Sequence, residues 1–108
     1  MGRPYLGEFE ELVLLTVAVL EGGAYGVTIA AELKNRTDRT ISLSGVHIAL
    51  YRLEEKGFVR SELGGATAAR GGRRKRLFQI TASGKQTLHE MRQVRNELWE
   101  AIPNPALS

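Results

Sequence analysis

Residues 42–57 read SLSGVHIALYRLEEKG and predict one well-bounded helix, roughly over residues 45–56. Ser42 and Ser44 supply hydroxyls of the kind that cap the start of a helix, and Gly57 marks its end. Apolar residues recur at spacings of three and four and give the helix one side to bury, namely Val46, Ala49, Leu50 and Leu53. The other faces carry His47, Ile48, Tyr51 and Arg52. It would be unusual for these four side chains to contact only water, so we expect this surface of the helix to bind another molecule.

Two further helices are expected before this one. Apolar residues repeat at helical spacing from Glu8 to Leu20, and Gly22-Gly23 ends that segment. A second helix is expected from about Val27 to Arg36, followed by a polar turn over residues 37–40.

The sequence period changes after Gly57. Residues 58–63 and 75–80 are short runs rich in Val, Leu, Phe and Ile, which predicts two strands. Residues 64–74 between them contain four glycines and read as the tip of a hairpin. Three helices followed by a two-stranded hairpin make a winged helix-turn-helix, a mainly α (α+β) fold.

A long last helix is expected after Thr81, which is placed to cap it, and before Pro103. At 1.5 Å per residue this helix is roughly 30 Å long. A single domain of this size cannot cover the whole apolar stripe of so long a helix. We therefore predict a winged-helix domain over residues 1–80 and a dimerisation helix with its tail over residues 81–108, together one compact unit. The alternative is packing against the chain's own first helix, and both can hold for different stretches. The predicted dimer contacts are Leu88, Met91, Arg95, Leu98, Trp99 and Ile102.

Composition excludes several classes of protein. The chain has 108 residues, enough for one domain, and no cysteine, which excludes disulfides, zinc–thiolate sites and thiol catalysis and agrees with a cytoplasmic location. Acidic residues precede the apolar run at 12–20, so it is not expected to be a signal peptide, and it is too short to span a membrane. His47 and His89 lack metal-site partners, and the serines lack a base partner. We expect no catalysis and no cofactor.

Positive charge is concentrated in one place. The net charge is +3, yet five of the seven residues 70–76 are basic. A helix fits the major groove of DNA, and hairpin cations can contact phosphates or a narrow minor groove, so we predict binding to double-stranded DNA. The residues expected to contact DNA on these grounds are Ser42, Ser44, His47, Ile48, Tyr51, Arg52, Arg70, Gly71, Gly72, Arg73, Arg74, Lys75 and Arg76.

Other interpretations of the same features remain open. A solvated charge run is the plain alternative for the hairpin. RNA binding is less favoured, because the chain lacks a sheet studded with aromatic residues for stacking on bases. Trp99, the single tryptophan, either packs in a core or interface, the favoured interpretation, or forms the wall of a pocket between subunits for a flat apolar ligand. A ligand-binding or protein-interaction dimer with incidental DNA affinity is therefore the second hypothesis.

From about residue 6 to residue 102 the sequence resembles the PadR family of bacterial regulators. The stretches that carry the resemblance are LGEFE at 6–10, AYGV at 24–27, SLSGVH at 42–47, RLEEKG at 52–57, RGGRRKR at 70–76 and TASG at 81–84. Tyr25, in the second stretch, joins the residues predicted to bind DNA. His47 departs from the tyrosine that family members often carry on the reading helix, which leaves the contact there and the operator sequence open.

The resemblance implies a transcription factor, usually a repressor. It also implies a homodimer that pairs through the C-terminal helix and reads a pseudo-palindromic operator. One helix after the hairpin is typical of the short members. Some of these bind flat aromatic compounds in a pocket at the dimer interface that includes a C-terminal tryptophan, and Trp99 is similarly placed. A small aromatic effector is therefore expected as a partner.

Overall fold

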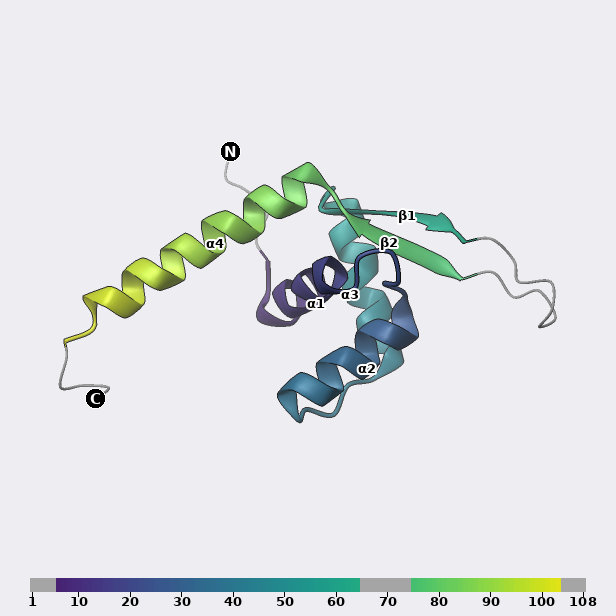
Figure 1. Cartoon of the computed structure of the whole chain (residues 1–108), viewed down its shortest axis with the longest axis horizontal. Coiled ribbons are helices and arrows are strands. Elements are labelled where there is room, and N and C mark those ends of the chain that lie inside the picture. Colours follow the sequence, from purple (N-terminus) through teal and green to yellow (C-terminus); the bar gives the residue numbers. More distant parts are fainter. Residues whose placement is uncertain (1–5, 65–74, 104–108) are drawn as a thin grey trace.

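The computed structural model describes residues 6–64 and 75–103. It contains four helices and one antiparallel pair of strands (Figure 1). The elements are, in chain order, α1 (Glu8–Val19), α2 (Gly26–Thr37), α3 (Leu43–Glu55), β1 (Val59–Leu63), β2 (Arg76–Ile80) and α4 (Ala82–Ala101). The mainly α winged-helix fold expected from the sequence is confirmed. The predicted hairpin tip, apart from Gly64, lies outside the described residues.

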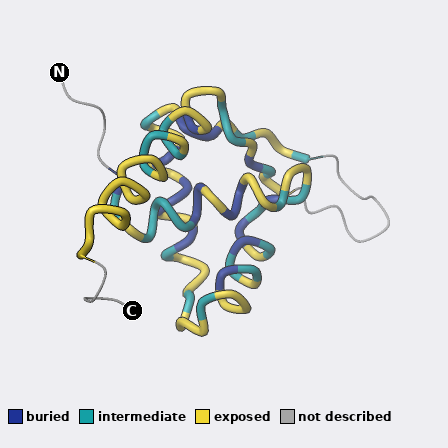
Figure 2. Tube along the Cα trace, turned by 60° about the vertical axis from the view of Figure 1, so that its left-hand side comes forward, coloured by how far each residue is buried: buried dark blue, intermediate teal, exposed yellow. Residues whose placement is uncertain are grey.

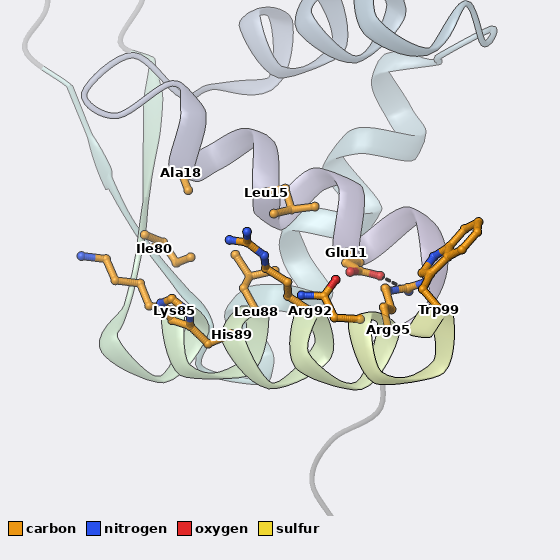
Figure 3. A pocket seen from close by; sticks show the side chains of 11 residues that line it. Glu11, Leu15, Ala18, Ile80, Lys85, Leu88, His89, Arg92, Arg95 and Trp99 are labelled. Carbon is orange, nitrogen blue, oxygen red and sulfur yellow. Dashed lines mark hydrogen bonds and ion pairs between the residues drawn. The ribbon is translucent and has the colours of Figure 1, made fainter. Parts of the chain in front are cut away.

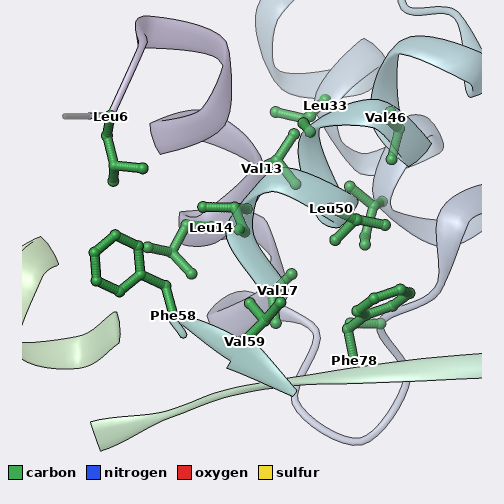
Figure 4. Packing of buried hydrophobic residues seen from close by; sticks show 14 residues of the cluster. Leu6, Val13, Leu14, Val17, Leu33, Val46, Leu50, Phe58, Val59 and Phe78 are labelled. Atoms are coloured by element: carbon green, nitrogen blue, oxygen red, sulfur yellow. The ribbon is translucent and has the colours of Figure 1, made fainter. Parts of the chain in front are cut away.

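Helix α1 supplies the centre of the core. Val13, Leu14 and Val17 are at most 1% exposed and lie among side chains from α2, α3 and both strands (Figure 4). The one buried polar side chain of the described residues, Thr16, donates its hydroxyl hydrogen to the carbonyl of Leu12 at 2.7 Å. Its polar atom is therefore satisfied within the helix, and the core can close over it without an unpaired group.

The buried face of α3 is the one that its apolar spacing predicts. Val46, Ala49, Leu50 and Leu53 are all at most 3% exposed. The helix begins two residues earlier than expected, because Ser42 is the N-cap and accepts a hydrogen bond from the Gly45 amide at 3.0 Å.

Two other helix boundaries follow from local hydrogen bonds. Helix α2 begins at Gly26, one residue earlier than expected, with Tyr25 as its N-cap. The Tyr25 amide donates to the Thr28 hydroxyl at 3.0 Å. Gly57 ends α3 at a φ of +82°, a left-handed conformation that glycine adopts without strain.

The two strands form a small sheet attached to the loop between α1 and α2. They pair in register from Val59 opposite Ile80 to Leu63 opposite Arg76. The amide of Phe78 donates to the carbonyl of Ala24 at 2.8 Å, which holds the sheet beside the start of α2. Phe78 itself is 6% exposed and closes that side of the core.

Helix α4 has buried side chains against the domain only in its first half. Thr81 caps it by accepting from the Gly84 amide at 3.0 Å, as the sequence predicts. Leu88 and Met91 are partly buried against the core, so the alternative of packing on the same chain holds for this half. From Arg92 to Ala101 every residue is exposed, and the helix extends away from the domain (Figures 1 and 2).

We expect Gly84→Ala to destabilise the protein, although alanine is the better helix former. A Cβ atom at residue 84 meets the Phe58 carbonyl oxygen at 2.3 Å and Ile80 Cγ1 at 2.8 Å, so the junction of α4 with the strands must shift. Overpacking of this kind costs about 1–3 kcal/mol, more than the gain in propensity of about 1 kcal/mol. Urea denaturation measures the change. Ser83→Ala, at an exposed neighbouring position, is the control, with a change under about 0.5 kcal/mol. Equal stability of the two variants would contradict the packing of Gly84.

Candidate nucleic-acid interface

The outward face of α3 carries large side chains that the fold does not use. Ile48 is 55% exposed and Tyr51 is 65% exposed, while Val46 and Leu50 on the opposite face are buried. Ser44, His47 and Arg52 are exposed on the same outward side. Because a monomeric domain gains nothing from presenting Ile and Tyr to water, this face is suited to contact with another molecule.

The two serines at the start of α3 have different roles. The hydroxyl of Ser42 caps the helix, so this residue serves the fold whether or not it also meets a phosphate. Ser44 is exposed within the first turn. Backbone N–H groups at a helix start attract anions, and a hydroxyl beside them adds a donor for a phosphate oxygen.

Arg52 stays at the surface although an acid lies near it. Glu10 of α1 accepts from Lys56 Nζ at 2.6 Å and lies 3.8 Å from Arg52 Nη1. The Arg52 side chain is 62% exposed, so the longer of these contacts leaves its guanidinium available. The closer Lys56 pair ties the end of α3 to α1, at a gain that is small for a partly exposed ion pair.

Tyr25 and Lys75 lie together although fifty residues separate them in the sequence. The Lys75 ammonium is 4.6 Å from the centre of the Tyr25 ring, within the range of a cation–π contact. Tyr25 is at the start of α2 and Lys75 directly precedes β2. Two of the residues predicted to contact DNA are therefore brought to one place, next to the base of the hairpin.

Arg76 is turned back onto the sheet. Its Nη1 donates to the Ser61 hydroxyl at 3.1 Å, and that hydroxyl donates to Glu54 Oε2 at 2.8 Å. The chain of contacts connects β2, β1 and the last turn of α3. Nothing local in the sequence marks Ser61 or Glu54, because their contact depends on the register of the strands. The five remaining hairpin residues, Arg70, Gly71, Gly72, Arg73 and Arg74, lie outside the described residues.

A groove of about 540 Å³ lies between α1 and α4 (Figure 3). Leu15 and Leu88 form part of its wall, and Trp99, 64% exposed, stands at one end. An ion pair between Glu11 and Arg95 joins the two helices beside it. The prediction that Trp99 packs in a core is wrong for the single chain, because the side chain is exposed, while an interface and the wall of a ligand pocket stay predictions for it.

Other kinds of site find no support in the described part of the chain. Within residues 6–64 and 75–103 no three His, Asp or Glu side chains come together as metal ligands would. In the same ranges no helix has the length and apolar character needed to cross a membrane.

Three helices, an antiparallel pair of strands joined by a segment rich in basic residues, and an exposed face on the third helix define a winged helix-turn-helix DNA-binding protein. The chain belongs to the transcriptional regulator PadR-like family, whose family model matches residues 14–90. The resemblance in the sequence is thereby confirmed. A search of curated proteins finds none that matches the chain.

Solved structures of similar fold agree with this assignment. A PadR family transcription regulator from Clostridium difficile R20291 shares 28% identity, with a TM-score of 0.69 over 90% of this chain and 98% of that one. A PadR-like regulator from Bacillus cereus has a TM-score of 0.74 at 18% identity, over 93% of this chain and 92% of that one. Bacillus subtilis PadR, solved in complex with operator DNA, has a TM-score of 0.63 at 22% identity, over 78% of this chain and 46% of that one.

Substitutions on the outward face of α3 should separate binding from stability. We expect Ile48→Ala and Tyr51→Ala to change the free energy of unfolding by less than about 0.5 kcal/mol, because both side chains are exposed. Each should weaken binding to duplex DNA by about 1–3 kcal/mol, the size of a lost base-pair contact. Leu50→Ala, on the buried face, is the comparison and should cost about 2–5 kcal/mol of stability. Denaturation and fluorescence anisotropy measure the two quantities. Unchanged DNA affinity in both exposed variants would contradict the role of this face.

Proposed function

We propose that this PadR-family protein is a sequence-specific repressor that binds double-stranded DNA as a homodimer in the cytoplasm. Helix α3 enters the major groove, and the basic hairpin contacts the backbone or the minor groove. The observation that carries the proposal is the exposed face of α3 around Ile48 and Tyr51, which has no use within the fold. Bacillus subtilis PadR, a protein of similar fold, was solved in complex with operator DNA, which supports DNA as the ligand of this fold.

The distribution of charge supports the hairpin as the second contact. Basic residues fill five of the seven positions from 70 to 76, and the last two of these, Lys75 and Arg76, lie at the base of the described strands. The acidic residues that form ion pairs with α3, α4 and the segment before α3 come mainly from α1. Positive charge is therefore concentrated at the hairpin, where it favours phosphates.

The second half of α4 supports the homodimer. Val94, Leu98 and Trp99 are each more than half exposed, and Ile102 is 37% exposed. Val94, Leu98 and Ile102 follow one another at spacings of four residues and form a stripe along one side of the helix. A second copy of α4 would cover that stripe, and twofold pairing would place two α3 helices about 34 Å apart, one turn of DNA. A pseudo-palindromic operator follows from that symmetry.

The groove between α1 and α4 favours a second function for the same dimer, ligand binding. Its apolar side chains and the ring of Trp99 suit a small aromatic effector. If DNA affinity were incidental, planar apolar compounds would quench Trp99 fluorescence, and duplex DNA would bind without any sequence preference. If the groove serves regulation, both kinds of binding occur, and the compound changes the affinity for the operator.

The first experiment compares duplex from the protein's own upstream region with random duplex over a salt series. We expect tighter binding to the upstream duplex and a steep fall of affinity with salt, since each phosphate contact adds about 0.9 to the slope of log affinity against log salt. Arg73→Ala combined with Arg74→Ala should weaken binding to every duplex alike and lower the slope by about 2.

Lys34→Gln, on the exposed surface of α2, is the control for charge loss and should leave the slope closer to the wild-type value. Equal, weak binding of the wild type to both duplexes would favour the interaction-dimer function. An unchanged slope in the double arginine variant would contradict the role of the hairpin.

Leu98→Lys should convert the dimer to a monomer, because it places a charge within the apolar stripe of α4. Gln93→Lys introduces the same side chain about 140° around the helix and should leave the dimer intact. Sedimentation velocity at micromolar concentration distinguishes the two states. A monomeric wild type, or a Leu98→Lys variant that stays dimeric, would contradict pairing through α4.

A further inference from the structure

Gly26, the first residue of α2, lies directly beneath the ring of His47 on α3. A Cβ atom at residue 26 would be 2.7 Å from His47 Cε1 and 2.9 Å from its Nε2, and 3.2 Å from Leu43 Cδ1. Ordinary contacts of a Cβ atom are 3.4 Å or longer. The backbone at Gly26 does not have a positive φ, so space, and not conformation, requires glycine at this position.

His47 thereby has its position set from a neighbouring helix. The residue is exposed on the outward side of α3, yet one edge of its imidazole rests on the backbone of α2. The side chain therefore stands between the two helices of the helix-turn-helix. The direction of the ring therefore depends on how much space residue 26 leaves beside it.

We propose that Gly26 is a positioning residue for operator recognition, which keeps the His47 imidazole against α2 at the angle used to read DNA. The proposal rests on the proposed function of α3. A side chain at residue 26 displaces the imidazole outward and changes which base pairs the protein prefers, without removing the ability to bind DNA.

The start of α2 cannot retreat to make room for a side chain. The carbonyl of Ala24 accepts from the Phe78 amide at 2.8 Å, and the Tyr25 ring lies 4.6 Å from the Lys75 ammonium. Gly26 is buried, and the Ile29 amide donates to the Tyr25 carbonyl at 2.9 Å. Residues 24–26 are thus held by the sheet, by the base of the hairpin and by their own helix.

The atoms that crowd residue 26 are, in contrast, the ends of side chains. His47 is exposed and Leu43 is 44% exposed, so both can rotate toward solvent at small cost. We therefore expect Gly26→Ala to fold and to show its effect at the imidazole.

The experiment is a double-mutant cycle on Gly26→Ala and His47→Ala. Affinity is measured for the operator and for a set of duplexes that each carry one base-pair change. Gly26→Ala should alter the preference at one or two base pairs by at least about fivefold, the lower range of a mismatch cost. His47→Ala should affect the same base pairs, and the double variant should show the profile of His47→Ala alone, because Gly26 acts only through the ring.

Gly23→Ala is the matched control. It makes the same chemical change three residues earlier, in the loop before α2, and the nearest atom to its Cβ is the Leu20 carbonyl oxygen at 3.8 Å. This variant should retain the wild-type preference. An unchanged preference in Gly26→Ala, or effects of the two substitutions that simply add, would overturn the proposal.

Two further measurements keep the outcome decisive. If Gly26→Ala does not fold, His47→Ala in the same chain should restore folding by removing the clash, and failure to restore it would overturn the proposal. The NMR resonance of His47 Hε1 should shift in Gly26→Ala and not in Gly23→Ala, which tests positioning without DNA. A wild-type protein that prefers no sequence would contradict the proposed function and the reading role, while an unmoved resonance would contradict the positioning itself.

Discussion

The burial of α1 is the interaction on which the remaining structure depends. One side of this helix supplies three residues that are at most 1% exposed, and α2, α3 and β2 all pack on it. Its acidic first turns contact the rest of the domain through Glu8 with Arg39, Glu10 with Lys56, and Glu11 with Arg95. These ion pairs join α1 to the segment before α3, to the residue that follows α3 and to α4. Because α1 covers the inner side of α3, only the outer side remains for DNA.

Most of the fold was predictable from the sequence, because local rules agree with the tertiary packing. The apolar spacing in α3 identifies all four of its buried residues, and the Thr81 cap places the start of α4. The predicted bounds differ from the structure by one or two residues at the ends of helices and at the start of each strand, and most at the start of α3. Ser42 and Ser44 are both good capping residues, and spacing alone does not decide between them. For α4 the sequence predicts pairing with a second copy or packing on its own chain. It does not show where along the helix burial ends, since that depends on how far the domain reaches.

The sequence predicts which residues belong to the candidate site, but it does not predict which of them contact one another. Ile48 and Tyr51 can be identified from the sequence because the apolar residues on the opposite face of α3 account for its contact with the core. The contact of Tyr25 with Lys75 joins positions fifty residues apart, and the chain from Arg76 through Ser61 to Glu54 depends on strand register. From the sequence alone, Gly26 is marked only as part of the stretch AYGV at 24–27, which resembles the PadR family. Its reason, the space taken by the His47 ring, exists only once α2 and α3 are packed.

Thr81 is the single residue between β2 and α4, and it also donates its hydroxyl hydrogen to the carbonyl of Gly57 at the end of α3. No flexible linker therefore separates the sheet, α3 and the long helix α4. In the proposed dimer, α4 behaves as a rigid lever that is fixed at this junction. Any change in the angle between two such levers rotates both DNA-binding units by the same amount. In such a dimer, a shift of one α4 helix against the other would therefore be passed directly to the sheet and to α3 of both copies.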